Sequence, residues 1–222
     1  MSTKHCSINF EHITAHEQYK ILAGSVVPRP IALITSVSKK GQVNAAPFSF
    51  FNALAADPPL VGFGIQRKPN GEPKDTYRNI IESGEFTVNI VSDDWVELMN
   101  ICAIPFEETV DETCMAELSV QAGTLIGSPR VVNAMIALEC VLFSEQSTGE
   151  RGDLILGKVV MAHIGENLIN TDNYHIDQVG LDAVGRMGGQ GYARTRDYFD
   201  LKSLKESELG TVDQVRVWAD HK

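Results

Sequence analysis

Short runs of alternating or clustered apolar residues recur along most of this chain, a pattern typical of β-strands. The first run, residues 31–37, is rich in β-branched side chains and ends at the turn signal Lys39-Lys40-Gly41. A second strand is predicted to begin near Gln42. A third, residues 60–65, follows a pair of prolines that cannot donate to a sheet and so mark a strand's entry. Three closely spaced strands therefore open the fold.

Later segments continue the pattern. Residues 86–91 alternate as a strand, and two long β-runs, 134–146 and 154–164, are joined by turn-forming residues 147–152. This arrangement predicts a long β-hairpin.

Only a few helices are predicted. Asp75 or Thr76 can cap a short helix that ends at Ser83-Gly84, and a second helix is predicted from residue 92 to about 104, before Pro105. The glycine-rich stretch 185–191 does not match the dinucleotide-binding fingerprint and is predicted to be a flexible loop. Because helices do not alternate with strands, the pattern favours an antiparallel barrel or sandwich over a doubly wound sheet.

Length and composition narrow the class of protein. With 222 residues, 43% hydrophobic and 22% charged, the chain fits one folded domain with additions. Nineteen basic against 29 acidic residues give a net charge of −10 with no basic cluster, which argues against nucleic-acid binding. We also expect no membrane span, no metal site, no disulfide framework and a cytoplasmic location, because apolar stretches are short and cysteine and histidine spacing lacks ligand patterns.

The side chains of Lys74-Asp75-Thr76 make this segment a candidate phosphate-binding site. Amide groups at a helix start, a lysine and a hydroxyl can together bind a phosphate dianion. An ordinary capped surface helix explains the same residues, since Asp75 is a common N-cap and Glu72 weakens the positive field. Local chemistry leaves both interpretations open.

A second candidate binding surface precedes Lys74 in the sequence. The small residues of Asn44-Ala45-Ala46-Pro47 would let the backbone approach a flat ring closely. Residues 48–52 then alternate between aromatic and polar side chains, which also fits a core strand with Ser49 facing solvent. Spacing alone does not choose between these interpretations.

Five motifs occur in order along the chain: Pro28-Arg29-Pro30-Ile31-Ala32, Asn44-Ala45-Ala46-Pro47-Phe48-Ser49, Pro58-Pro59, Lys74-Asp75-Thr76 with Asn79-Ile80, and Glu85-Phe86-Thr87-Val88-Asn89. Together they resemble the flavin reductase-like family, which includes flavoredoxin and the reductase components of two-component monooxygenases. The likeness continues through residues 137–140, 157–160 and 186–192, so it covers about residues 19–201.

The resemblance implies a mainly β, FMN-binding split β-barrel, antiparallel and of Greek-key type with a few short helices. It also implies a homodimer with the flavin near the subunit interface. Carried over by motif, Lys74 and Thr76 would contact the phosphate. The remaining implied cofactor contacts are Thr35 and Ser36 at the polar half of the ligand, Ser49, Phe50, Phe51 and Asn52 beside the ribityl chain or phosphate, Arg29, Asn44, Ala45, Ala46 and Pro47 along the isoalloxazine edge, and Tyr192 closing the site.

The same resemblance implies an NAD(P)H-dependent flavin reductase. Hydride would pass from a nicotinamide to FMN. Reduced flavin or electrons would then pass to a monooxygenase or another redox partner. No catalytic acid or base is required, because the cofactor supplies the chemistry. The alternatives are a flavoredoxin-like electron carrier and a flavin-free barrel. Nicotinamide preference, electron acceptor and tightness of FMN binding are left open.

Two segments have no counterpart in the motifs. The acidic loop 107–113 is one, and the tail after residue 201 is the other. We therefore divide the chain into a barrel domain, residues 1–201, and a C-terminal extension, residues 202–222. The extension is predicted either as an amphipathic helix and a strand that reaches a partner subunit, or as a loosely packed terminus.

Overall fold

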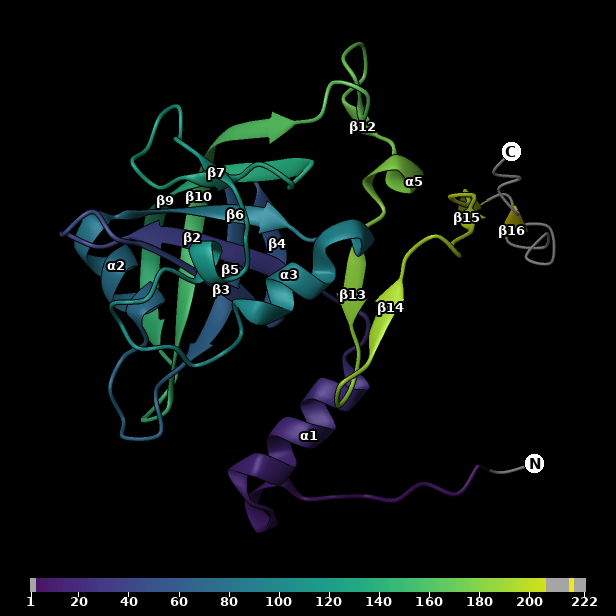
Figure 1. Ribbon diagram of the computed structural model, residues 1–222. Coiled ribbons are helices and arrows are strands. Elements are labelled where there is room, and N and C mark those ends of the chain that lie inside the picture. The colour runs from purple at the N-terminus through teal and green to yellow at the C-terminus, as the bar shows by residue number, and fades with distance from the viewer. Residues whose placement is uncertain (1–2, 207–215, 218–222) are drawn as a thin grey trace.

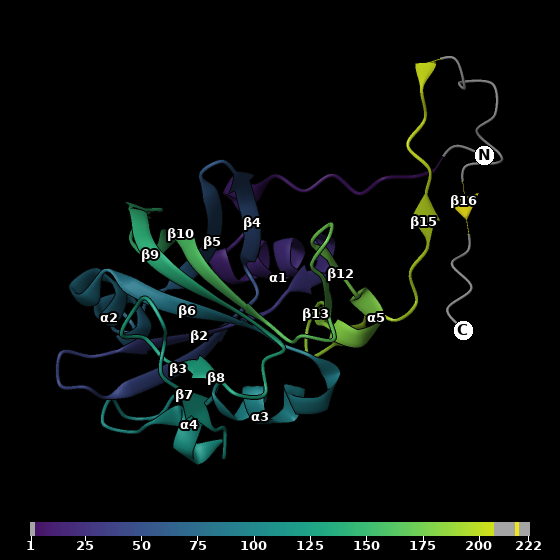
Figure 2. The same cartoon turned by 90° about the horizontal axis from the view of Figure 1, so that it is seen from above.

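A seven-stranded antiparallel sheet forms the centre of the molecule (Figure 1), in a computed structural model that describes residues 3–206 and 216–217. The strand order is β3-β2-β6-β9-β10-β5-β4. The strands are β2 (Ala32–Val37), β3 (Val43–Phe48), β4 (Phe51–Ala56), β5 (Pro59–Gln66), β6 (Glu85–Ile90), β9 (Ile136–Ser147) and β10 (Gly152–Ile164). Figure 2 shows the strongly twisted sheet with β3 and the β4–β5 hairpin at its two ends.

The ends of this sheet meet without forming a ladder. β3 and β4 are joined by the two-residue bend Ser49-Phe50, and the Gly64 amide of β5 donates to the Phe50 carbonyl at 2.8 Å. β3 pairs with β2 alone, and β5 pairs with β4 and β10. An incompletely closed seam therefore runs between β3 and β5.

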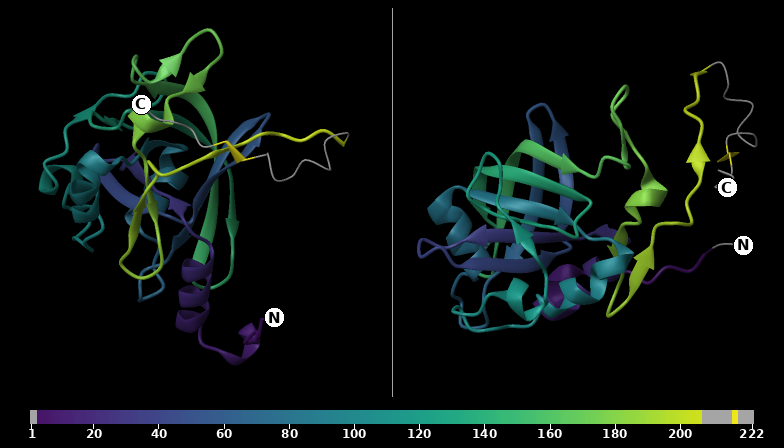
Figure 3. Two further views of the ribbon diagram at one scale, coloured as in Figure 1. Left: turned by 90° about the vertical axis from the view of Figure 1, so that its right-hand side faces the viewer. Right: turned by 45° about the horizontal axis from the view of Figure 1, so that its top comes forward.

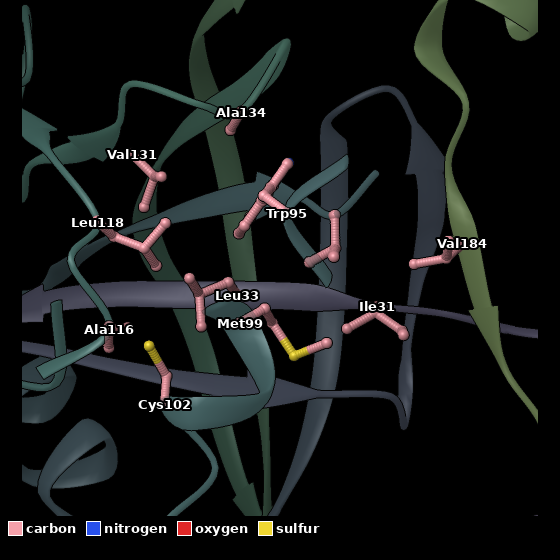
Figure 4. Close-up of a cluster of buried hydrophobic side chains, with 12 residues drawn as sticks. Ile31, Leu33, Trp95, Met99, Cys102, Ala116, Leu118, Val131, Ala134 and Val184 are labelled. Carbon is pink, nitrogen blue, oxygen red and sulfur yellow. The ribbon is translucent and has the colours of Figure 1, made fainter. Parts of the chain in front are cut away.

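The core consists of two clusters, because successive side chains of a strand point to opposite faces of the sheet. Ala32 and Ile34 of β2 join the cluster inside the curled sheet, which includes Phe63 and Phe86. Leu33, on the opposite face, joins a second cluster. Figure 4 shows that cluster, in which Trp95, Met99 and Cys102 from one helical segment pack beside Ile31, Leu33 and Val184; its labelled members also include Ala116, Leu118, Val131 and Ala134.

Short helices lie around the sheet. They are η1 (Phe10–His12), α1 (Ala15–Ser25), α2 (Asp75–Ser83), η2 (Asp93–Trp95), α3 (Val96–Ile101), α4 (Glu112–Met115) and α5 (Gln178–Leu181). α1 begins with a capping box between Thr14 and Glu17 and projects from the barrel (Figure 1). The sequence analysis predicted no helix there, because Ala23 is the buried residue of this helix and its apolar pattern is therefore weak.

Further strands form small sheets outside the barrel. They are β1 (Arg29–Pro30), β7 (Val120–Gln121), β8 (Arg130–Val131), β11 (Ile169–Asn170), β12 (His175–Ile176), β13 (Val184–Arg186), β14 (Tyr192–Arg194), β15 (Asp200–Leu201) and β16 (Arg216–Val217). The three-stranded sheet β1-β13-β14 lies between α1 and α5 (Figure 3).

Most predicted elements are confirmed. The mainly β antiparallel class, the opening strands and the β9–β10 hairpin agree with the structure, and α2 ends where predicted, at Gly84. The prediction of a flexible loop at residues 185–191 was wrong, because β13 and β14 pair across it as a hairpin. The predicted helix from residue 92 to about 104 is shorter, comprising η2 and α3 and ending at Ile101.

The C-terminal extension is described only in part. Arg216–Val217 pairs with Asp200–Leu201, so this strand pair crosses the boundary predicted at residue 201. The helix predicted in the extension lies mainly outside the described residues. Within the described part of the chain, no helix is long and apolar enough to cross a bilayer.

Candidate flavin site

The seam between β3 and β5 is hollowed along its length. A cavity of about 890 Å³ lies at the α2 end. A second cavity, of about 730 Å³, lies towards the β3–β4 bend. Both are lined by Pro47, Phe48, Gln66 and Lys74, so they form one continuous groove, called the seam groove below. Volumes of this size are typical of small-molecule and cofactor sites.

The start of α2 forms the polar end of the seam groove. Lys74 is the N-cap residue, and no side chain caps the first turn, so the first amide groups of α2 remain available to a ligand. Thr76, 1% exposed, accepts a hydrogen bond from Asn44 Nδ2 at 2.9 Å through its hydroxyl oxygen. That bond leaves the Thr76 hydroxyl hydrogen free to point to a ligand.

Ion pairing distinguishes Lys74 from the other cations around the 890 Å³ cavity. Arg67 pairs with Asp153 at 3.0 Å, and Lys68 pairs with Asp75 at 3.2 Å. Among the described residues Lys74 has no carboxylate within salt-bridge distance, and burial lowers the pKa of its ammonium, an effect that Asp75 opposes. An anion bound here would meet a positive charge that none of the described carboxylates neutralises.

Aromatic residues line the opposite end. Phe50 is 41% exposed, and its ring stacks on Tyr19 with centroids 5.9 Å apart. Phe48, behind it, packs into the barrel core against Phe63. Gly64 of β5 lies across the seam groove and presents no side chain. This end therefore offers flat apolar surface, whereas the α2 end offers hydrogen-bond donors and positive charge.

Comparisons with known proteins agree with this geometry. A family model described as a flavin reductase-like domain matches residues 23–179. The chain belongs to the flavin reductase-like family. Membership supports oxidoreductase chemistry with a flavin, and the two ends of the seam groove fit the phosphate and the ring of such a cofactor.

Three solved structures are similar to this flavin reductase-like protein in sequence or in fold. Nitrilotriacetate monooxygenase component B from Bacillus cereus is 39% identical, covers 90% of this chain and 100% of its own, and superposes with a TM-score of 0.85. The 2-nitrobenzoate 2-nitroreductase NbaA of Pseudomonas fluorescens is 33% identical, covers 90% of this chain and 98% of its own, and has a TM-score of 0.84. A split-barrel-domain flavin reductase from Shewanella frigidimarina, 20% identical with coverages of 90% and 100% and a TM-score of 0.78, shows the shared fold, so the predicted split barrel is confirmed.

Eight of the residues predicted to contact the cofactor line the seam groove or the cavities next to it. They are Asn44, Ala46, Pro47, Ser49, Phe50, Lys74, Thr76 and Tyr192, the last of which lines two smaller hollows beside the groove. The structure thus brings together the two segments that the sequence singled out, residues 44–50 and 74–76.

The other six predicted residues lie elsewhere, mainly because successive strand residues face opposite sides. Thr35 is buried and its hydroxyl donates to the Pro129 carbonyl, while Ser36 accepts from Asn79 Nδ2 at 3.2 Å behind α2. Ala45 and Phe51 each belong to one of the two core clusters. The Asn52 side chain accepts a hydrogen bond from the Ala53 amide on β4. The last of the six is Arg29.

Arg29 has a structural role. Its buried guanidinium donates to the carbonyls of Val26 at 2.8 Å and Met187 at 3.2 Å, and also to the Ala23 carbonyl and the Ser49 hydroxyl. The guanidinium carbon also lies 5.6 Å from the centre of the Phe50 ring. Arg29 therefore fixes the end of α1, the β13–β14 hairpin and the β3–β4 bend relative to one another.

Sequence reasoning missed the outer wall of the seam groove. Residues 102–107 and Glu112 line the 890 Å³ cavity, although the acidic loop 107–113 has no counterpart in the sequence motifs. Glu112 Oε2 accepts from the Ala45 amide of edge strand β3 at 3.0 Å, and burial raises the pKa of the Glu112 carboxyl despite that bond. No local pattern could reveal a contact between residues 67 positions apart.

Proposed function

We propose that this protein binds FMN in the seam groove, with the phosphate at the start of α2 and the isoalloxazine towards Phe50. The observation that carries the proposal is Lys74, a cation without a carboxylate partner among the described residues, which lies beside uncapped helix amides at one end of the groove. One such anchor matches the single phosphate of FMN, and a phosphate at a helix start is favoured by both the amides and the helix dipole. In this position Asn44 orients the Thr76 hydroxyl towards the phosphate.

We further propose that the protein is an NAD(P)H-dependent flavin reductase. When bound, FMN supplies the hydride-accepting chemistry, so the side chains need only hold the ring and limit its contact with water. Phe48 and Pro47 supply a rigid apolar wall, and Glu112 holds strand β3 in place through Ala45. Similarity to a monooxygenase component supports a monooxygenase or another redox protein as the acceptor of the reduced flavin or its electrons.

A homodimer is part of the same proposal. Leu54, on end strand β4, is 53% exposed, and Phe143 on β9 is 52% exposed. Apolar residues exposed along sheet strands are typical of surfaces that a second copy covers. Light scattering coupled to size-exclusion chromatography tests this point, and a monomer across the micromolar range would contradict it.

Anaerobic reduction tests the reductase. Purified protein loaded with FMN is mixed separately with NADH and NADPH without oxygen, and loss of flavin absorbance near its visible maximum is followed. Prompt bleaching by at least one nucleotide is expected. Bleaching only by a reduced protein donor would instead favour the flavoredoxin-like electron carrier, and failure to retain or bind any flavin would contradict the cofactor proposal itself.

A further inference from the structure

A small hollow lies beside the seam groove and shares its wall. It has a volume of about 150 Å³ and is lined by residues from the β3–β4 bend, α3 and the β13–β14 hairpin. Pro47, Phe48 and Ser49 line both this hollow and the seam groove. This hollow and the seam groove therefore share a wall formed by three consecutive residues. We call this space the side hollow.

The floor of the side hollow is apolar and fixed. Ile31 and Met99 line it, and both belong to the core cluster in Figure 4, where their side chains lie next to each other. The hairpin wall is also held in place, since the Val184 amide donates to the Val91 carbonyl at 3.1 Å and Arg29 donates to Met187. The side hollow is thus a built feature of the fold.

Tyr192 separates the side hollow from a larger one. Tyr192 and Asn100 line both the side hollow and a neighbouring cavity of about 490 Å³. The Tyr192 hydroxyl donates to Asn100 Oδ1 at 3.3 Å, and the tyrosine is 39% exposed. Because this ring lines both spaces, its displacement would join them into one channel.

Arg186 provides an unneutralised charge at this point. Its guanidinium carbon lies 4.5 Å from the centre of the Tyr192 ring, and its Nη2 donates to the Gly189 carbonyl at 2.7 Å. The nearby Arg194 and Arg196 pair with Asp93 and Asp182, whereas Arg186 has no carboxylate partner among the described residues. An arginine held over an aromatic ring beside an apolar hollow is suited to a ring that carries an anion.

We propose that the side hollow binds the second substrate of the flavin, a planar ring bearing an anionic group, with the anion at Arg186 and the ring between Met99 and Tyr192. This inference rests on the flavin assignment of the seam groove. Two kinds of molecule share that chemistry, a nicotinamide dinucleotide with its pyrophosphate and an aromatic carboxylate. The 490 Å³ cavity beyond Tyr192 would receive the remainder of the longer molecule.

The test measures binding without turnover. Flavin-loaded wild-type protein and the variant Arg186→Gln are titrated by calorimetry with NAD⁺, NADP⁺ and benzoate, none of which reduces the flavin. Arg196→Gln is the matched control, because it removes an arginine that pairs with Asp182 and lines neither hollow. Loss of a charged hydrogen bond is expected to weaken binding of at least one probe about tenfold in Arg186→Gln. Arg186→Lys should recover part of that loss, and the control should match the wild type.

The outcomes distinguish the two possible occupants of the side hollow, and they distinguish a failure of this proposal from a failure of the flavin assignment. Weakening confined to the dinucleotides identifies the electron donor as the occupant, and weakening confined to benzoate identifies an aromatic carboxylate. Unchanged affinity of Arg186→Gln for all three probes, with flavin retained, would overturn the side-hollow proposal alone. Flavin content is read from the absorbance of each preparation before titration, so a failure of the seam groove to hold flavin is recognised separately.

Discussion

Charge pairing, rather than charge itself, distinguishes Lys74 and Arg186 from the cations next to each of them. Arg67, Lys68, Arg194 and Arg196 are each neutralised by a nearby aspartate. Lys74 has no such partner among the described residues, and it lines the seam groove. The sequence showed these side chains as equivalent scattered positive charges, and only their partners in space distinguish them.

Replacing Lys74 by methionine should weaken FMN binding about tenfold or more, because the phosphate loses a charge-assisted contact while the apolar stem is kept. Riboflavin, which lacks the phosphate, should bind equally well to the wild type and the variant. Quenching of flavin fluorescence measures both affinities. Lys39→Met is the control, since Lys39 is exposed and lies 3.7 Å from Glu82, away from the groove; equal loss of both flavins in Lys74→Met would count against the phosphate contact.

Glu139 is a buried carboxylate that fixes the segment before β8. It is 0% exposed and accepts from the amides of Thr124 at 2.6 Å and Leu125 at 2.7 Å, and its Oε1 lies 2.6 Å from His163 Nε2. Burial raises the pKa of this carboxyl, but these hydrogen bonds together lower it below its usual 4.5. The charged form is therefore favoured by folding, and its stabilisation is present above pH 4.5 and is lost as the pH falls through the lower folded pKa.

Glu139→Gln should consequently reduce the free energy of unfolding at pH 7 by about 1–3 kcal/mol. Below pH 4.5 the difference from the wild type should shrink, because the carboxyl is protonated first in the unfolded chain and then, below the lower folded pKa, in the native protein as well. Urea unfolding at pH 7 and in the acid range measures both values. The exposed Glu82→Gln should change stability by less than about 0.5 kcal/mol, and a constant Glu139→Gln effect across pH would disprove the charge argument.

Helix α2 shows how an element is positioned by its two ends. It begins at Lys74 without a side-chain cap, and it ends at Gly84, whose φ of +75° lies in the left-handed region. The amide of Gly84 donates to the Ile80 carbonyl at 2.8 Å, which closes the last turn. The uncapped start faces the groove, so the stability of the helix depends on its end and on the packing of Ile80.

A matched pair of glycine substitutions tests this element. Gly84→Ala should cost about 1–2 kcal/mol, because an alanine there has open space around its Cβ but a strained left-handed backbone. Gly24→Ala, in α1, meets nothing within 4 Å and has an ordinary helical backbone, so it should stabilise by about 0.5–1 kcal/mol. Denaturant unfolding of both variants gives the comparison, and similar effects of the same sign would refute it.

Strand β3 is the element around which the whole site is arranged. Its outward amide at Ala45 is occupied by Glu112, and the next outward position is Pro47, which has no amide hydrogen. The edge is thereby protected from pairing with another strand. Ala46, which lies between these two positions, lines the seam groove together with Pro47.

The whole molecule combines one barrel with segments that reach away from it. Figures 1 and 3 show the N-terminal arm, α1 and the β15–β16 pair projecting from the barrel, while every residue that lines the seam groove precedes residue 155. The described part of the extension thus lies outside the groove. The predicted division between a barrel domain, residues 1–201, and a C-terminal extension can therefore be tested by shortening the chain.

A chain that ends at residue 201 should retain FMN with unchanged affinity, because all the described residues that line the seam groove come earlier in the chain. It loses the β15–β16 pair, and a larger dimer dissociation constant of the shortened chain would show that this pair contacts a second copy. Fluorescence titration and light scattering on the shortened and full-length chains measure the two effects. A loss of FMN binding would show that the extension completes the site.

The sequence alone determined the strand-rich class, the β9–β10 hairpin, the end of α2 and the two segments that meet at the groove, because each depends on neighbours within a few residues. Motif resemblance added the family and the cofactor class. Tertiary structure alone decided which residues of β3 line the groove, that Arg29 and Thr35 serve the core, and that Glu112 and Arg186 lie beside the site. These facts depend on strand pairing and charge partners far apart in the chain, and local pattern carries no information about such contacts.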